Sequence, residues 1–125
     1  MKIDVDDPLR VLDLAFHIPD PIFVAEFPNE RQFQRFIEKT FLGAEWAVYH
    51  TWNSIRSPPG FPDLVLVSSR TGRTLFAELK TEKGSLTDNQ SLWLANLAKR
   101  NEVWLWRPSD KDEYLGVIEE DYAGG

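Results

Sequence analysis

The chain has 125 residues, enough for one compact domain that hides roughly two-thirds of the surface of the unfolded chain. It contains no cysteine, which excludes disulfides, thiolate metal sites and cysteine nucleophiles, and only His17 and His50 offer imidazole. Any metal ion is therefore expected to have oxygen ligands, which favours magnesium, manganese or calcium over zinc or copper.

The net charge of −6 is unevenly distributed. Residues 1–30 and 101–125 each carry −5, whereas residues 31–100 carry +4. A basic centre gives weak support for an anionic partner, although such asymmetry also arises by chance. The first residues are too acidic for a signal peptide, and no apolar run reaches the roughly 20 residues that span a bilayer. We expect no membrane partner and a cytoplasmic location (the host cytoplasm if the protein is phage-encoded).

The N-terminal part of the chain divides into an arm and a helix. Residues 1–28 are rich in proline and lack a sustained period, which predicts an irregular arm that packs on a domain formed by residues 29–125. Asn29 is a helix cap with Gln32 in capping-box position, and apolar side chains follow at helical spacing. This pattern predicts a first helix that ends at Gly43.

Three strands are predicted next. Residues 46–52 form the first strand, and a loop follows over residues 53–62. The β-rich runs 63–69 and 74–80 flank a turn at residues 70–73, which predicts a hairpin.

The last third of the chain adds a helix, a strand and a short helix. Residues 87–100 have helical spacing, and residues 102–107 are apolar on both faces, which places that strand inside the sheet. Because a helix intervenes, this strand should run parallel to the second hairpin strand. Ser109 or Asp110 is expected to cap a last helix that ends near Ile118. The fold class is therefore α/β, with the order α-β-β-β-α-β and one mixed sheet flanked by helices.

Charged side chains gather at one end of the predicted hairpin. Glu78 and Lys80 are two residues apart on a strand and so point to the same face. If Ser69 pairs with Thr74, Asp63 lies directly opposite Lys80 and diagonal to Glu78. Two carboxylates and one ammonium then converge, which indicates a metal-dependent site. The bare spacing is explained as simply by a salt bridge between Asp63 and Lys80.

Two further features favour a site over a salt bridge. Asp63 follows Gly60-Phe61-Pro62, so the chain is stiff where it enters the strand. Glu30 lies on the apolar stripe of the first helix, where a carboxylate is costly unless a metal ion or Lys80 pairs with it.

Four segments, in order, resemble a VRR-NUC domain, the phage-type branch of the PD-(D/E)XK nuclease superfamily. They are Glu30-Arg31-Gln32-Phe33-Gln34, Gly60-Phe61-Pro62-Asp63-Leu64-Val65-Leu66-Val67, Leu75-Phe76-Ala77-Glu78-Leu79-Lys80 and Leu86-Thr87-x-x-Gln90. The resemblance covers residues 29 to about 107. It implies a restriction-endonuclease-like core and a magnesium-dependent DNA endonuclease, in which manganese can replace magnesium. Branched or junction DNA is one candidate substrate, and duplex and single-stranded DNA stay open.

The resemblance also implies roles for individual residues. Asp63 and Glu78 match the metal ligands, together with the main-chain carbonyl of Leu79. Glu30 matches the helix carboxylate that completes the metal shell, often through water. Lys80 matches the lysine that orients the attacking water or stabilises the developing charge.

Gln90 matches the glutamine that faces the site from the second helix, but Thr87-x-x-Gln90 is also a capping box, and the two interpretations are equally supported. Candidate contacts to nucleic acid lie in the loop before Asp63 and after Lys80, namely Asn53, Ser54, Arg56, Ser57 and Lys83. Arg70 and Arg73 are interpreted as solubilising turn residues, and His50 as structural. Trp104 and Trp106 alternate within a strand and are interpreted as core.

A domain with one active site that cuts both strands of a duplex needs a second copy, so a homodimer is expected, as in the junction-resolving enzymes that relatives resemble. The arm offers apolar surface for pairing, or it covers its own domain, through Leu12, Leu14, Phe16, Ile22 and Phe23. The alternatives to a nuclease are a nucleic-acid-binding module of the same fold without catalysis, and a protein-interaction domain.

Overall fold

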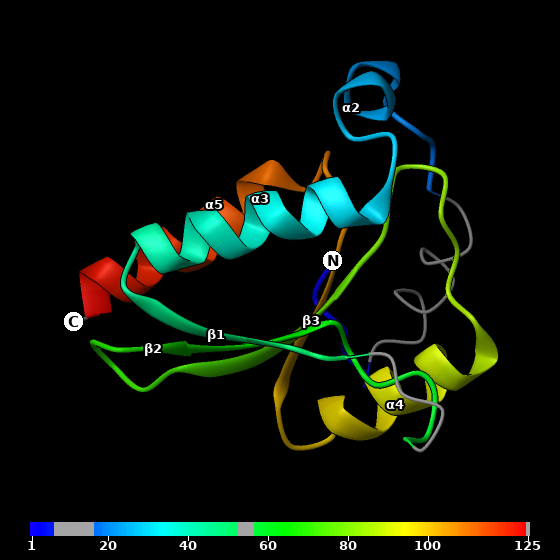
Figure 1. The fold of residues 1–125 in the computed structure, drawn as a ribbon. Coiled ribbons are helices and arrows are strands. Elements are labelled where there is room, and N and C mark those ends of the chain that lie inside the picture. The colour runs from blue at the N-terminus through cyan, green and yellow to red at the C-terminus, as the bar shows by residue number, and fades with distance from the viewer. Residues whose placement is uncertain (7–16, 53–56, 125) are drawn as a thin grey trace.

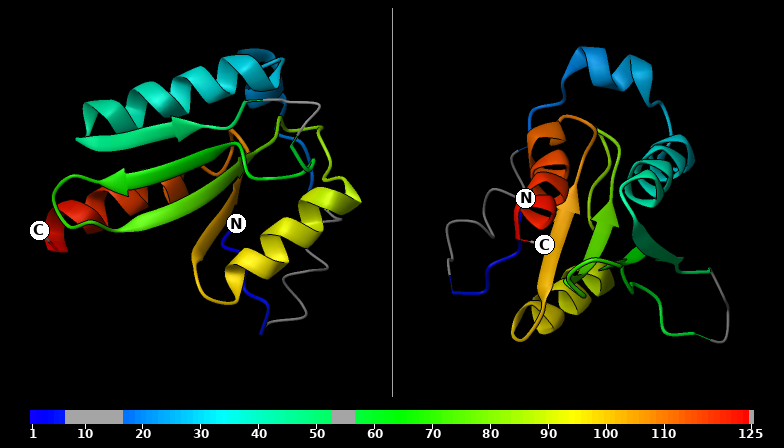
Figure 2. Two further views of the ribbon diagram at one scale, coloured as in Figure 1. Left: turned by 60° about the horizontal axis from the view of Figure 1, so that its bottom comes forward. Right: turned by 90° about the vertical axis from the view of Figure 1, so that its left-hand side faces the viewer.

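The computed structural model describes residues 1–6, 17–52 and 57–124. These residues form one mixed sheet with the strand order β1-β2-β3-β4. The strands are β1 (Trp46–His50), β2 (Leu64–Ser68), β3 (Thr74–Leu79) and β4 (Glu102–Trp106). The helices are α2 (Pro21–Glu26), α3 (Glu30–Gly43), α4 (Asp88–Ala98) and α5 (Lys111–Gly124). Helices α3 and α5 lie side by side on one face of the sheet and α4 lies on the other, as Figures 1 and 2 show. The predicted α/β fold is confirmed.

Helix α3 forms for the reason that its sequence suggested. The Asn29 side chain accepts a hydrogen bond from the main-chain N–H of Gln32 at 3.0 Å, which satisfies one of the free donors at the helix start. Phe33, Ile37 and Phe41 recur at helical spacing, and all three are fully buried. This stripe packs on the sheet and fixes the helix against it.

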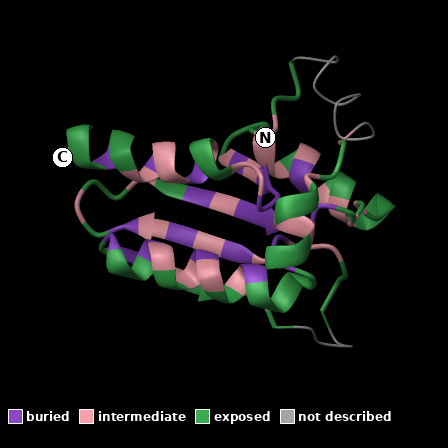
Figure 3. Cartoon of the chain, turned by 90° about the horizontal axis from the view of Figure 1, so that it is seen from above, coloured by how far each residue is buried: buried purple, intermediate pink, exposed green. Residues whose placement is uncertain are grey.

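The core lies between the sheet and the helices α3 and α5. Leu64, Leu66, Leu75 and Ala77 point into it from β2 and β3 and are fully buried, whereas the residues between them are only half-buried. This alternation is visible along the strands in Figure 3. The Trp106 ring stacks on Phe41 with ring centroids 5.6 Å apart, and the predicted core role of Trp106 is confirmed.

Strand β4 runs parallel to β3, as predicted, but it is the last strand of the sheet and not an inner one. Its outer edge is covered by the first residues of the chain. The Leu105 N–H donates to the carbonyl of Met1 at 2.9 Å, and the Ile3 N–H donates to the carbonyl of Val103 at 2.8 Å. This cover explains why an apolar strand is tolerated at the end of the sheet.

The hairpin differs from the predicted register. Leu64 pairs with Ala77 and Val67 with Thr74, so the strands are shifted by two residues from the pairing of Ser69 with Thr74. The cause is a side chain at the turn. The Ser68 hydroxyl accepts hydrogen bonds from two main-chain N–H groups, those of Arg70 and Thr71, at 3.1 and 3.2 Å. The turn therefore begins at Ser68, and the predicted position of Asp63 opposite Lys80 is wrong.

Helix α5 extends to Gly124, well beyond the predicted end near Ile118. Its extension is held by Asp121, which is 3% exposed and accepts a hydrogen bond from the Ser68 hydroxyl at 2.6 Å. The side chain of Asp121 also accepts a hydrogen bond from the Thr71 hydroxyl. The hairpin turn and the end of the chain thus stabilise one another.

The arm is not irregular throughout, because Pro21–Glu26 form helix α2, capped by Asp20. Phe23 packs against the core, while Ile22 is 74% exposed. Three of the apolar arm residues, Leu12, Leu14 and Phe16, lie outside the described residues. No helix among the described residues is long and apolar enough to cross a membrane.

Candidate active site

Asp63 and Glu78 come together at the end of the hairpin. Leu64 and Ala77 form the last pair of the ladder, and the next residues outward along both strands are Asp63 and Glu78. Because Leu64 and Ala77 point into the core, Asp63 and Glu78 point to the opposite face. Side chains at directly opposite positions have Cβ atoms about 4.5–5.5 Å apart, so the two carboxylates are close neighbours.

The main chain holds Asp63 from both sides. Its carbonyl accepts a hydrogen bond from the Thr51 N–H at 2.8 Å, and its carboxylate accepts one from the Leu79 N–H at 2.8 Å. The Thr51 hydroxyl donates to the carbonyl of Pro62 at 2.6 Å. In an antiparallel pair the N–H and C=O of a residue point to the same neighbouring strand, so the Leu79 carbonyl also faces the strand that carries Asp63.

Glu78 is buried without enough compensation for a charge. It is 1% exposed, and its Oε1 accepts a hydrogen bond from the Gln90 amide at 3.2 Å. Its Oε2 is buried and receives no hydrogen bond from the described residues, and only a protonated Glu78 could donate one to the neighbouring Asp63 carboxylate. Burial raises the pKa of Glu78 to about 9, and the negative charge of Asp63 adds to that rise. Burial also raises the pKa of Asp63, against the opposing effect of the Leu79 N–H.

These atoms form a donor set for a hard divalent cation. Two carboxylates and one main-chain carbonyl are the ligands that magnesium and manganese prefer. The buried Oε2 of Glu78 lacks a partner that a cation would supply. Across residues 1–6, 17–52 and 57–124, the structure gathers no group of three or more acidic or histidine side chains into a metal site. The side-chain ligands brought together are therefore Asp63 and Glu78.

Lys80 and Glu30 form an ion pair beside the carboxylates. The Lys80 Nζ lies 3.3 Å from Glu30 Oε1, and Lys80 is 7% exposed. Glu30 stands at the first position of α3 with its side chain 51% exposed, so the expected burial on the apolar stripe is wrong. Its proximity to Lys80 nevertheless places a third carboxylate at the edge of the site.

Gln90 performs both of the roles that its sequence position allowed. Its Oε1 accepts a hydrogen bond from the Thr87 N–H at 2.9 Å, and its own N–H donates to the Thr87 hydroxyl at 3.2 Å. These two bonds make the capping box of α4. The side-chain Nε2 of Gln90 donates to Glu78 Oε1 at 3.2 Å. Gln90 therefore connects the start of α4 to the buried carboxylate.

The candidate contacts to nucleic acid are placed only in part. Asn53, Ser54 and Arg56 lie outside the described residues. Ser57 is exposed and lines a hollow beside the site, and Lys83 is exposed in the turn after β3.

Other polar residues are structural. His50 Nδ1 lies 3.5 Å from Glu38. Arg70 pairs with Glu45 and lies over the ring of Tyr122 at 3.6 Å, so it does more than solubilise a turn.

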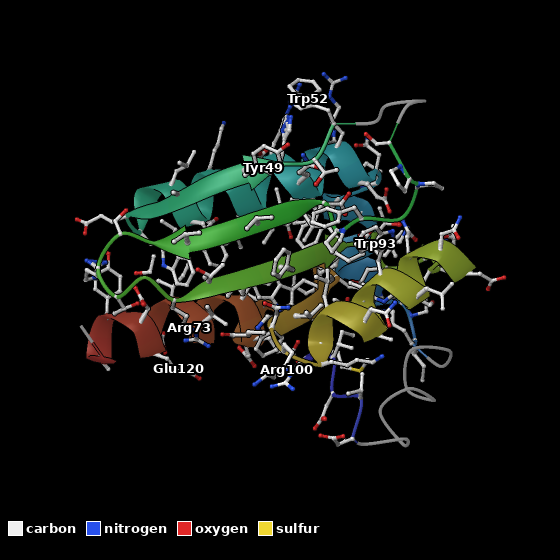
Figure 4. All side chains as sticks on the ribbon, turned by 90° about the horizontal axis from the view of Figure 1, so that it is seen from below. Tyr49, Trp52, Arg73, Trp93, Arg100 and Glu120 are labelled. Carbon is white, nitrogen blue, oxygen red and sulfur yellow. The ribbon has the colours of Figure 1, made fainter. Side chains whose placement is uncertain are left out.

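Arg73 likewise contacts two glutamates, Glu102 at 2.7 Å and Glu120 at 3.2 Å. Figure 4 shows Arg73 and Glu120 near one another at the α5 side of the sheet. The interpretation of Arg70 and Arg73 as mere solubilising residues is therefore wrong. Both anchor the hairpin turn to its neighbours.

Two buried residues that the sequence did not single out hold the chain after Lys80. Arg107 donates to the carbonyls of Thr81 and Gly84 at 2.8 and 2.6 Å. Glu82 is 2% exposed and accepts hydrogen bonds from the N–H groups of Asp20 and Ser109 at 2.9 and 3.0 Å. A glutamate and an arginine next to apolar strand residues are the only signal for them in the sequence, and it does not identify their partners.

A mixed sheet whose hairpin ends in an opposed aspartate and glutamate, with a lysine two residues further on, is the core of the restriction-endonuclease-like nucleases. The family model of the VRR-NUC domain matches residues 19–104 of this chain. The chain therefore belongs to the VRR-NUC domain family and is a nuclease domain.

Two solved structures are similar to it. One, described as a VRR_NUC domain, is 26% identical with a TM-score of 0.58, over 72% of this chain and 94% of that one. The other is Hjc, a Holliday junction resolvase from Archaeoglobus fulgidus, 26% identical with a TM-score of 0.46, over 62% of this chain and 67% of that one. Among curated proteins, none is significantly similar to this chain.

Proposed function

We propose that this protein is a magnesium-dependent endonuclease that hydrolyses phosphodiester bonds in DNA, with manganese able to replace magnesium. The observation that carries the proposal is the buried Oε2 of Glu78, which lies beside the Asp63 carboxylate and receives no hydrogen bond from any donor among the described residues. A carboxylate in this setting is costly to ionise unless a cation compensates it. Two buried neighbouring carboxylates destabilise the metal-free fold, so a purely structural role does not account for them.

Asp63, Glu78 and the Leu79 carbonyl would hold the cation. When bound, it would supply Lewis-acid chemistry, polarising the scissile phosphate and raising the acidity of water next to it. Asp63 is oriented for this by the Leu79 N–H, and Glu78 by the Gln90 amide. The two ligands are therefore held in place by hydrogen bonds before any ion arrives.

Lys80 would act on the charge that develops on the phosphate oxygens. Its ammonium group is nearly buried, so its field is less screened than that of a surface lysine. Glu30 holds it at 3.3 Å and keeps it beside the carboxylates. Glu30 would also complete the shell of the cation through water, a role that is compatible with its exposed side chain.

Cleavage assays with matched variants test the proposal. Asp63→Asn, Glu78→Gln and Lys80→Ala should each abolish cutting of labelled duplex, nicked, flapped and four-way DNA. Magnesium or manganese should support cutting, whereas calcium should bind without efficient turnover. Glu38→Gln is the control, since Glu38 contacts only His50 among its ion pairs in the described chain.

The outcomes separate the possible functions. Robust cutting in excess chelator, or near-normal activity of Asp63→Asn, would refute the metal mechanism. DNA binding by the wild-type protein without cutting in any metal would instead identify a binding module of the same fold.

A further inference from the structure

A hollow of about 820 Å³ opens on the face of the sheet opposite α3 and α5. Its floor includes Tyr49 and Val65, which are paired across β1 and β2. One wall is the segment from Ser57 to Phe61, and another is the start of α4 with Trp93. Figure 4 shows this face. Tyr49 projects from β1, Trp52 from the segment just after β1, and Trp93 from α4.

The aromatic side chains of the hollow are of two kinds. Phe61 is held edge-on against Trp93, with ring centroids 5.2 Å apart, and against Phe76 at 6.0 Å. Tyr49 and Trp52 are 60% and 73% exposed, and the Trp52 ring is held edge-on against His50 with ring centroids 4.3 Å apart. Large aromatic rings left in water next to a hollow mark a binding surface rather than a core.

The lining suits a nucleic acid base. Among the described residues that line the hollow, none is acidic or basic. This described part of the lining is uncharged and offers flat aromatic surface and neutral polar groups instead. Aromatic rings stack on the flat face of any base, and hydroxyl and amide groups bond to base edges. Such groups are supplied here by Thr51, Ser57, Thr87 and Gln90.

Two residues that line the hollow, Thr51 and Gln90, are hydrogen-bonded to the carboxylate pair's own residues. Gln90 lines it and donates a hydrogen bond to Glu78 at 3.2 Å. Thr51 lines it too, and its N–H donates to the carbonyl of Asp63 at 2.8 Å. A base in the hollow would thus belong to a nucleotide next to the phosphate at the carboxylates. A base inside a duplex is stacked on both faces and cannot enter such a site without leaving the stack.

We propose that the hollow lined by Tyr49, Trp52 and Trp93 binds an unpaired base adjacent to the phosphate that is cut. The substrates are then DNA molecules with unpaired nucleotides at the cleavage point, such as flaps, single strands or open branch points. This inference rests on the proposed nuclease function where cleavage is measured. Binding of an unpaired base in chelator can be measured whether or not the protein cuts DNA.

The test compares the variants Tyr49→Ala and Trp52→Ala with the control variant Leu42→Ala. Leu42 is an apolar residue on α3 that is 58% exposed. Fluorescence anisotropy of labelled oligo(dT), a flapped duplex and a blunt duplex is measured in chelator, where no cutting occurs. Tyr49→Ala and Trp52→Ala should weaken binding of oligo(dT) and the flap about tenfold and leave the blunt duplex within about twofold. Trp52→Phe should restore most of the loss, and Leu42→Ala should bind like the wild type.

Three results would overturn the inference. The first is unchanged binding of oligo(dT) and the flap by both variants, and the second is an equal loss for the blunt duplex. The third is a second copy of this chain as the occupant, seen as loss of a dimer on sedimentation of Trp52→Ala with DNA binding unaffected.

Failure of the inference is distinguishable from failure of the proposed function. Metal-dependent cutting that needs Asp63 and Glu78 but ignores unpaired nucleotides would refute the base site alone. Selective loss of oligo(dT) binding in the variants, without cutting of any DNA by the wild type, would refute the nuclease function alone.

Discussion

Glu78→Gln should stabilise the metal-free protein at neutral pH, although it removes a residue essential to the proposed activity. The pKa of Glu78 is raised from 4.5 to about 9 in the folded chain, first by burial and then by the charge of Asp63. Between these two values the folded protein holds a proton that the unfolded chain releases. The contribution of Glu78 to stability is therefore greatest below pH 4.5 and is lost as pH rises towards 9.

The size of the effect follows from the same shift. Each pH unit inside the window costs about 1.4 kcal/mol, so at pH 7 the loss approaches about 3 kcal/mol. Glutamine has nearly the same shape, does not ionise and still accepts a hydrogen bond from Gln90. For a domain of this length, that free energy corresponds to a rise in melting temperature of about 11–13 °C.

Thermal unfolding in chelator, followed from pH 5 to pH 9, measures this directly. The melting temperature of the wild type should fall across the range relative to that of Glu78→Gln, while Glu38→Gln should follow the wild type. Added magnesium should raise the melting temperature of the wild type more than that of Glu78→Gln, because only the wild type keeps both carboxylates. Parallel pH profiles for wild type and Glu78→Gln would refute the assignment of Glu78 as an uncompensated buried acid.

Three other outcomes are expected. Gly60→Ala should lower the free energy of unfolding, measured by chemical denaturation, by roughly 2 kcal/mol or more, because φ is +101° and a Cβ atom would lie 2.6 Å from the main chain of Asn89. Gly72→Ala should lower it by only about 1 kcal/mol, because φ is +74° but the space around the Cβ atom is open. Affinity for DNA should fall steeply with salt despite the net charge of −6, and an affinity independent of salt would contradict binding through the basic residues 31–100. Light scattering at micromolar concentration should give the mass of a homodimer; a strict monomer that nicks one strand would contradict pairing.

From residue 29 onward, the order of helices and strands was predictable because each element carries its own period, whereas helix α2 in the arm was not predicted. The stripe of Phe33, Ile37 and Phe41 has helical spacing, and β2 and β3 alternate between buried and half-buried side chains. The hairpin register was not predictable from these periods. A shift by two residues keeps every side chain on its face, so the hydrophobic pattern permits both pairings. The choice depends on the Ser68 hydroxyl at the turn.

The site was predictable in its members more than in its contacts. Asp63, Glu78 and Lys80 were singled out by their spacing together with the resemblance to the VRR-NUC domain, but the register decides that Asp63 lies opposite Glu78 and not opposite Lys80. That difference changes the local chemistry, because Asp63 opposite Lys80 would be a neutral ion pair, whereas Asp63 opposite Glu78 brings two carboxyl groups together. The aromatic hollow was missed, since Tyr49 and Trp93 are far apart in sequence and each is compatible with an ordinary core position.

The single amide of Gln90 has a consequence for how ligands influence one another. Its oxygen faces the Thr87 N–H and its nitrogen faces Glu78, and a reversed amide would oppose donor to donor and acceptor to acceptor. If a cation binds as proposed, a shift of Glu78 that keeps this hydrogen bond would pull on the first turn of α4, which is a wall of the aromatic hollow. Reciprocity then requires that a ligand in the hollow change the affinity for the cation by the same factor by which the cation changes the affinity for that ligand.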